Sequence, residues 1–162
     1  MRIGLISDTH NDRDAVGRAL AGLRSEGIVA VLHAGDVTSA GTLRLFEGFK
    51  MLVARGNMDH DAALGTTAVE LFGVGCFKPL HQLTLDGVSI ALAHDSNAIE
   101  AHRLIVAGET DYIIVGHSHK RQDQRLGRTR VINPGALGNA RWDRPSFAIL
   151  DTDRDELTSI EL

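Results

Sequence analysis

Residues 3–10 read IGLISDTH, and this stretch sets the pattern on which the fold prediction rests. The short apolar run predicts a strand over residues 3–7, and Asp8 and His10 follow where that strand would end. The alternation continues along the chain, with helices expected at residues 12–25 and 38–49 and strands at residues 28–32 and 51–54. Repeated strand–helix–strand units predict a mostly parallel sheet covered by helices.

The second half of the chain predicts a second sheet. Asp86 and Gly87 separate two apolar runs, at residues 82–85 and 88–93, which is a strong signal for a two-residue hairpin. A helix is expected at residues 96–107, a strand at residues 112–115, and antiparallel late strands at residues 129–132, 147–151 and 157–162. Residues 61–79 show no clear pattern and are expected to form a surface loop or a lid. The whole predicts one α/β domain over residues 1–162, with two sheets packed between helix layers.

The composition excludes several classes of protein. The chain has 162 residues, is 43% hydrophobic and carries a net charge of −4, so it is neither disordered nor strongly basic. Its one cysteine cannot form an internal disulfide, which argues against a secreted scaffold. It shows neither a signal peptide nor an apolar run of about 18 residues. We expect a cytoplasmic protein without a membrane partner, and no nucleic-acid partner beyond a small nucleotide.

The most informative feature is the position of the polar side chains. Nearly every expected strand runs into a group that can bind a metal ion, and in α/β sheets ligands gather at the carboxyl ends of strands. Members of each Asp-x-His or His-x-His pair are two residues apart, so in extended backbone both would project the same way. Seven side chains are therefore expected to converge: Asp8, His10, Asp36, Asn57, His94, His117 and His119.

The chemistry of these ligands indicates the kind of ion. They are nitrogen and oxygen donors without a thiolate, which suits Mn, Fe, Zn, Ni or Co and disfavours an iron–sulfur cluster. Seven side chains are too many for one tetrahedral ion but suit two divalent ions that share a carboxylate. The two ions would bring more positive charge than Asp8 and Asp36 remove. This excess would attract a phosphate, and a bridging water would lose a proton to give a hydroxide nucleophile.

These residues carry a family resemblance. The motifs Asp8-Thr9-His10, Gly35-Asp36, Gly56-Asn57-x-Asp59, His94 and Gly116-His117-x-His119 resemble the signature of calcineurin-like metallophosphoesterases. The short chain and the later Asn133-Pro134-Gly135 are similar to small phosphodiesterases of the YfcE type. The resemblance implies a four-layer α-β-β-α sandwich of two mixed sheets, and a hydrolase with two divalent ions, of which manganese is expected first.

The resemblance also implies a role for each ligand. It places Asp8, His10 and His119 on one ion, places Asn57, His94 and His117 on the other, and makes Asp36 the bridging carboxylate. Asp36, Asn57 and His94 are expected to take part in catalysis as well. The implied reaction is hydrolysis of a phosphodiester by in-line attack of a metal-bridged hydroxide on phosphorus.

Two departures from the family pattern affect substrate handling. Met58 stands where many relatives have a histidine that protonates the leaving group, and a thioether cannot donate a proton. This predicts a preference for diesters or activated esters. His94-Asp95 replaces the usual His-Gly-His, so Asp95 is expected either to orient a ligand imidazole or to cap the following helix.

A few residues near these motifs have two readings. Asp59 is expected to orient the Asn57 loop rather than to bind metal. His60 either replaces the missing acid or is a solvated loop residue. Arg121 either holds an anionic substrate or belongs to a solvated hairpin.

Two other functions are compatible with the same residues. One is a phosphomonoesterase that acts on a small phosphorylated metabolite. The other is a non-catalytic scaffold on this fold, as in the Vps29 component of retromer, but all seven ligand positions carry competent side chains, which favours catalysis. The expected partner is a small phosphoester substrate, and a homo-oligomer is left open.

Overall fold

The computed structural model describes residues 1–162. Its first sheet has six strands in the order β11-β10-β1-β2-β3-β4. These strands are β1 (Arg2–Ile6), β2 (Ala30–His33), β3 (Lys50–Ala54), β4 (Phe77–Lys78), β10 (Ser146–Asp151) and β11 (Glu156–Glu161). Strands β1 to β4 are parallel, and β10 and β11 add an antiparallel edge. The parallel sheet predicted from the first strand–helix–strand units is confirmed.

The second sheet has five strands in the order β5-β6-β7-β9-β8. They are β5 (Leu80–Leu85), β6 (Val88–Ala93), β7 (Tyr112–Ile114), β8 (Gln122–Leu126) and β9 (Thr129–Asn133). The predicted hairpin joins β5 to β6, and its turn has φ +50° at Asp86 and +82° at Gly87, as a type I′ turn requires. Strand β9 was expected to be only antiparallel. It pairs in parallel with β7 and antiparallel with β8, so this sheet is mixed as well.

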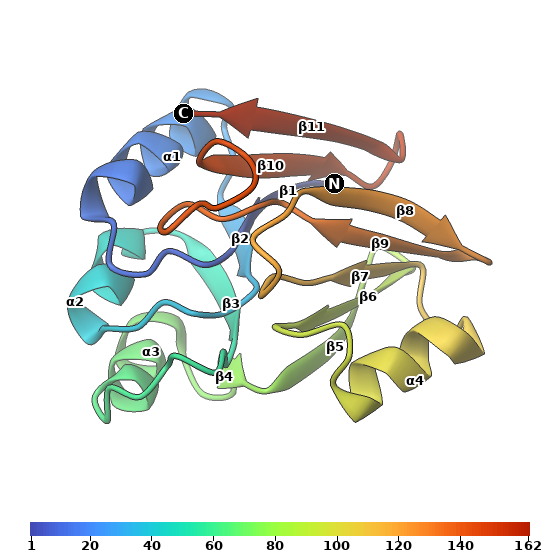
Figure 1. The fold of residues 1–162 in the computed structure, drawn as a ribbon, viewed down its shortest axis with the longest axis horizontal. Coiled ribbons are helices and arrows are strands. Elements are labelled where there is room, and N and C mark those ends of the chain that lie inside the picture. The colour runs from blue at the N-terminus through green and yellow to red at the C-terminus, as the bar shows by residue number, and fades with distance from the viewer.

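Helices cover the outer face of each sheet (Figure 1). They are α1 (Arg13–Ser25), α2 (Ala40–Leu43) with a 3-10 turn η1 (Arg44–Phe46), α3 (Leu64–Phe72) and α4 (Ile99–Ala107). Helix α1 begins where the Asp12 carboxylate accepts a hydrogen bond from the Ala15 N–H, and it turns its apolar stripe to the first sheet. No helix is long and apolar enough to cross a bilayer.

Three apolar clusters separate the four layers. One lies between α1 to α3 and the first sheet, and includes Leu20, Phe46 and Phe147. The second lies between the two sheets, and includes Leu5 of the first and Ile114 of the second. The third joins the second sheet to α4. The arrangement is therefore a four-layer α-β-β-α sandwich of two mixed sheets, as the family resemblance implied.

Two expectations about local structure were wrong. The helix predicted over residues 38–49 is only the short α2 and η1, because the chain leaves the helix at Glu47 and turns at Gly48, where φ is +92°. Residues 61–79, expected to form a loop or a lid, contain α3 and β4. Helix α3 packs Leu64 and Ala68 into the first core cluster, so this segment is part of the fold.

Candidate metal centre

The seven predicted side chains lie together at the carboxyl ends of five strands. The loops after β1, β2 and β3 of the first sheet and after β6 and β7 of the second meet there, because both sheets direct these strand ends to the same side. A cleft of about 340 Å³ opens onto this place. It is lined by His10, Asp36, Asn57, Met58, His117, His119, Asn139 and Arg141.

The backbone at the site is left-handed, not extended. Asp8 has φ +51° and His10 +42°, and His117 and His119 have +66° and +57°. The extended Asp-x-His and His-x-His pairs expected from the sequence are therefore wrong, although both members of each pair do reach the site. Non-glycine residues with positive φ are uncommon and gather at functional sites, where the surrounding structure holds them in place.

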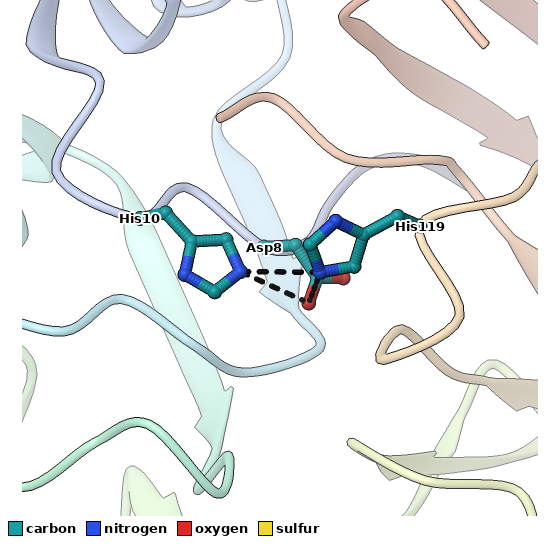
Figure 2. A group of neighbouring side chains, drawn as sticks. All are labelled: Asp8, His10 and His119. Atoms are coloured by element: carbon teal, nitrogen blue, oxygen red, sulfur yellow. Dashed lines mark hydrogen bonds and ion pairs between the residues drawn. The ribbon is translucent and has the colours of Figure 1, made fainter. Parts of the chain in front are cut away.

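Asp8, His10 and His119 form one half of the site (Figure 2). The Nε2 atoms of His10 and His119 are 3.2 Å apart, and they lie 3.7 and 3.3 Å from Oδ1 of Asp8. Oδ2 of Asp8 accepts hydrogen bonds from the Ser7 hydroxyl and the His117 N–H, but the buried Oδ1 has no hydrogen-bond donor. A buried carboxylate oxygen without a donor, facing two imidazole nitrogens, fits a divalent cation.

The other half combines an amide with two imidazoles. Oδ1 of Asn57 lies 3.0 Å from His94 Nε2 and 3.0 Å from His117 Nδ1, and these two nitrogens are 3.3 Å apart. Oδ2 of Asp36 lies between the halves, 3.4 Å from His94 Nε2 and 3.7 Å from His10 Nε2. Asp36 therefore faces an imidazole of each half.

Backbone carbonyl groups orient two of the imidazoles. His94 Nδ1 lies 2.7 Å from the Ala34 carbonyl oxygen, and His119 Nδ1 lies 2.9 Å from that of Asn139. A carbonyl can only accept, so each Nδ1 carries the proton and each Nε2 is left with a free lone pair toward the site. This is the tautomer that a metal ligand needs.

The electrostatics keep both carboxyl groups ionised. Burial alone would raise the pKa of Asp8, but the neighbouring His10 imidazole and the Ser7 hydroxyl hold that pKa below its ordinary value. Burial also opposes ionisation of Asp36, and there the His94 imidazole and the Met58 N–H lower the pKa. For His94, burial lowers the pKa, and Asp36 with the Ala34 carbonyl outweighs it and raises the pKa.

Two glycines let the loops approach closely. A side chain at Gly116 would put its Cβ 2.7 Å from Oδ2 of Asp8 and 2.9 Å from the Ala34 carbonyl oxygen. A Cβ at Gly56 would lie 2.9 Å from Cγ of Asp36. Both distances are shorter than van der Waals contact, so only glycine allows these strand ends to meet.

Asp59 joins two of the loops, as the sequence suggested for the Asn57 loop. Its Oδ2 accepts hydrogen bonds from the N–H of Gly56 at 2.7 Å and of Asp36 at 3.2 Å, and its Oδ1 accepts from the N–H of Thr38 at 2.8 Å. Burial raises the pKa of this carboxyl, against the lowering effect of the Thr38 and Gly56 N–H groups. Asp59 does not line the cleft.

Two other residues named from the sequence lie apart from the cleft. The Asp95 carboxylate accepts the N–H of Asn97 at 2.8 Å, so it shapes the turn before α4 and does not orient the His94 imidazole. His60 is exposed and does not line the cleft, so its position favours the solvated-loop reading. Met58 does line the cleft, and its N–H donates to Oδ1 of Asp36 at 2.8 Å.

The arginine at the cleft is not the one named from the sequence. Arg121 is paired with Asp143 at 3.4 Å and with Glu161 at 2.7 Å, and it does not line the cleft. Asn139 and Arg141 line it instead, from the segment between β9 and β10. Neither residue was predicted from the sequence, where the available signal was their place shortly after the Asn-Pro-Gly motif.

Comparisons with known proteins identify the family. Residues 1–155 match the model of the calcineurin-like phosphoesterase superfamily domain. A phosphodiesterase of Methanocaldococcus jannaschii is 26% identical over 165 residues, covering 100% of this chain and 99% of the relative. The solved structure of a novel archaeal phosphodiesterase has a TM-score of 0.90 at 26% identity and covers 100% of both chains.

More distant solved structures share the fold. The phosphoesterase YfcE from E. coli has a TM-score of 0.69 at 19% identity, covering 99% of this chain and 98% of that one. Vacuolar protein sorting 29 from Cryptosporidium parvum has a TM-score of 0.72 at 18% identity, covering 99% and 97%. These two likenesses concern the fold alone. The family match over residues 1–155 carries the assignment, and the chain belongs to the calcineurin-like phosphoesterase superfamily.

Proposed function

We propose that this chain is a phosphodiesterase that hydrolyses phosphodiester bonds at a dinuclear centre of divalent metal ions. The observation that carries the proposal is the unpartnered Oδ1 of Asp8, which is buried against two imidazole nitrogens in a cleft. Family membership supports a hydrolase, and the relative from M. jannaschii that spans the whole chain is named a phosphodiesterase.

We assign the ligands according to the two halves of the site. Asp8, His10 and His119 would hold one ion, and Asn57, His94 and His117 would hold the other. Asp36 would bridge them, because its Oδ2 faces His10 on one side and His94 on the other. Mn²⁺ is the first candidate, and Fe, Zn, Ni or Co would suit the same nitrogen and oxygen donors.

The protein residues divide the work around a bound substrate. When bound, the two ions lower the pKa of a water molecule to supply the nucleophile and neutralise charge that develops on the phosphate. Asp36, Asn57 and His94 would hold the ions beside the substrate and are the residues we place in catalysis. The residue that lines the cleft at position 58 is a methionine, which cannot donate a proton to the leaving group. Diesters with good leaving groups are therefore the preferred substrates.

The remaining assignments concern the setting of the enzyme. We propose that residues 1–162 act as one domain on a small phosphoester, in the cytoplasm, where a lone buried Cys76 stays reduced. A small nucleotide is the only nucleic-acid ligand we expect. Whether copies associate is a question for sedimentation of the metal-loaded protein.

An activity assay on metal-stripped protein tests the proposal. Mn²⁺, Fe²⁺, Zn²⁺, Ni²⁺ or Co²⁺ is added back, and hydrolysis of bis-p-nitrophenyl phosphate is compared with that of p-nitrophenyl phosphate. We expect activity only with metal, faster on the diester, and lowered by at least about 100-fold in Asp36→Asn. Asp95→Asn is the matched control and should keep full activity, because that carboxylate faces Asn97.

Other results would support a different function. Faster hydrolysis of the monoester would make the protein a phosphomonoesterase. No hydrolysis with any metal would favour the non-catalytic scaffold. Equal activity of Asp36→Asn and the wild type would contradict the proposed site.

A further inference from the structure

The segment between β9 and β10 forms two hydrogen bonds with residues of the candidate metal centre. The Gly138 N–H donates to the Asp8 carbonyl oxygen at 2.8 Å. The Asn139 carbonyl accepts from His119 Nδ1 at 2.9 Å, and Asn139 itself has φ +50°. Both hydrogen bonds lie within three residues of Arg141, so the backbone that carries this arginine is held by Asp8 and His119.

Arg141 is a free cation at the cleft. It is the one lysine or arginine that lines the cleft, together with five of the seven candidate ligands. Its guanidinium has no ion pair or hydrogen bond within the chain, whereas Arg121 next to the site is paired with Asp143 and Glu161. The N–H donors of the Arg141 guanidinium therefore have no acceptor within the chain.

The chemistry of the cleft indicates what this guanidinium meets. A guanidinium offers parallel N–H donors that match two oxygens of a phosphate, and such charge-assisted pairs are about twice as strong as neutral hydrogen bonds. A substrate phosphate drawn to the centre would keep at least one oxygen turned toward the rim where Arg141 lies.

We propose that Arg141 is a substrate-binding residue, which pairs its guanidinium with an oxygen of the phosphoester in the cleft. This inference rests on the proposed function, because it names a contact to the substrate of the same site. It also gives the anion contact to Arg141 and not to Arg121, for which the sequence left a substrate contact and a solvated hairpin open.

Three variants in the metal-loaded protein test the inference. Arg141→Gln removes the charge, and Arg141→Lys keeps the charge without the parallel N–H donors of the guanidinium. Arg144→Gln is the matched control. Arg144 is exposed on the same segment, has no ion pair and does not line the cleft. The readouts are KM and kcat on bis-p-nitrophenyl phosphate, the dissociation constant of inorganic phosphate by calorimetry, and bound metal by elemental analysis.

The expected result is a loss of anion binding without a loss of metal. Arg141→Gln should weaken phosphate binding and raise KM by about 10- to 100-fold, the range expected for a charged hydrogen bond. Arg141→Lys should lie between this and the wild type, and Arg144→Gln should match the wild type.

The inference is overturned if Arg141→Gln binds phosphate and substrate as the wild type does, or if Arg144→Gln loses as much. These outcomes differ from failure of the proposed function. If the wild type hydrolyses no phosphoester but binds phosphate through Arg141, the proposed enzymatic function is refuted and the proposed anion-binding role of Arg141 stands. If Arg141→Gln is fully active, only the proposed role of Arg141 is refuted, and the proposed enzymatic function stands.

Discussion

Replacing Asp59 by asparagine is expected to loosen two loops of the candidate metal centre at once. The Asp59 carboxylate is almost fully buried and accepts three backbone N–H groups, two on Oδ2 and one on Oδ1. Asparagine keeps the shape but has only one acceptor oxygen. In its better orientation it would keep the donors from Gly56 and Asp36 and turn its NH₂ group toward the N–H of Thr38.

The size of the effect follows from the one donor that loses its acceptor. An unsatisfied buried donor costs about 1–3 kcal/mol, so the free energy of unfolding should fall by that amount. For a domain with about 5–15 kcal/mol in total, the variant still folds. Asp59 holds the backbone of Asp36 and of Gly56, which precedes Asn57. Residues that orient metal ligands typically change metal affinity or activity by about 10- to 100-fold, and we expect a loss in that range.

Two measurements on the same protein check this reasoning. Urea unfolding gives the free energy of unfolding, and calorimetric titration with Mn²⁺ gives the metal affinity. Asp61→Asn is the matched control, since its carboxylate accepts the N–H groups of Ala40 and Ala63 and accepts none from Asp36 or Gly56. It should keep wild-type metal affinity. A folded Asp59→Asn variant that binds Mn²⁺ as tightly as the wild type would refute the role given to Asp59.

Three further substitutions have defined outcomes. Hydrogen bonds from Arg128 and Ser89 lower the pKa of Asp111 to about 2 in the folded protein. The ionised carboxylate therefore stabilises the fold fully at pH values above its unfolded pKa of about 3.9, and this stabilisation is lost as the pH falls through 2. Asp111→Asn should therefore lower the free energy of unfolding by about 1 kcal/mol at pH 7, after allowance for partial exposure. The loss should shrink as the pH falls from about 4 to below 2, which urea midpoints across pH will check. Met58→His should speed hydrolysis of esters with poor leaving groups by about 10-fold or more and flatten the dependence of rate on leaving-group pKa, whereas an unchanged dependence would count against the missing acid. Gly116→Ala should abolish metal binding measured by elemental analysis, because the new Cβ meets Asp8, and a variant with full metal content would show that the close approach is not needed.

The sequence was sufficient to predict which strands end at the site. Polar residues followed five apolar runs in order, and parallel strands bring their carboxyl ends together whatever the loops between them do. The seven side chains accordingly lie together, and five of them line one cleft. The fold class followed from the same alternation, together with the Asp86-Gly87 hairpin that begins the second sheet.

The conformation of the loops could not be predicted in the same way. Asp8 and His10 were expected in extended backbone, but their positive φ values depend on packing against the Ala34 and Gly116 segments, which no local pattern encodes. Helix α3 was missed because it is short and its burial is decided by the first core cluster.

The arginine at the cleft could not be chosen from the sequence for a related reason. Arg121 and Arg141 look alike in the sequence, and both follow candidate ligands or turn motifs at short distance. Only the folded structure shows that Asp143 and Glu161 come from other segments to occupy Arg121. The ion pairs of a surface arginine depend on the tertiary structure, so the spacing of residues in the sequence could not predict a substrate contact of this kind.

A crystal grown with Mn²⁺ and measured for anomalous scattering tests the central claim most directly. We predict two anomalous peaks about 3.5–4 Å apart. One should lie at bonding distance from Asp8, His10 and His119, the other from Asn57, His94 and His117, with Asp36 touching both. A map with no peak in the cleft, or with manganese held by none of these side chains, would contradict it.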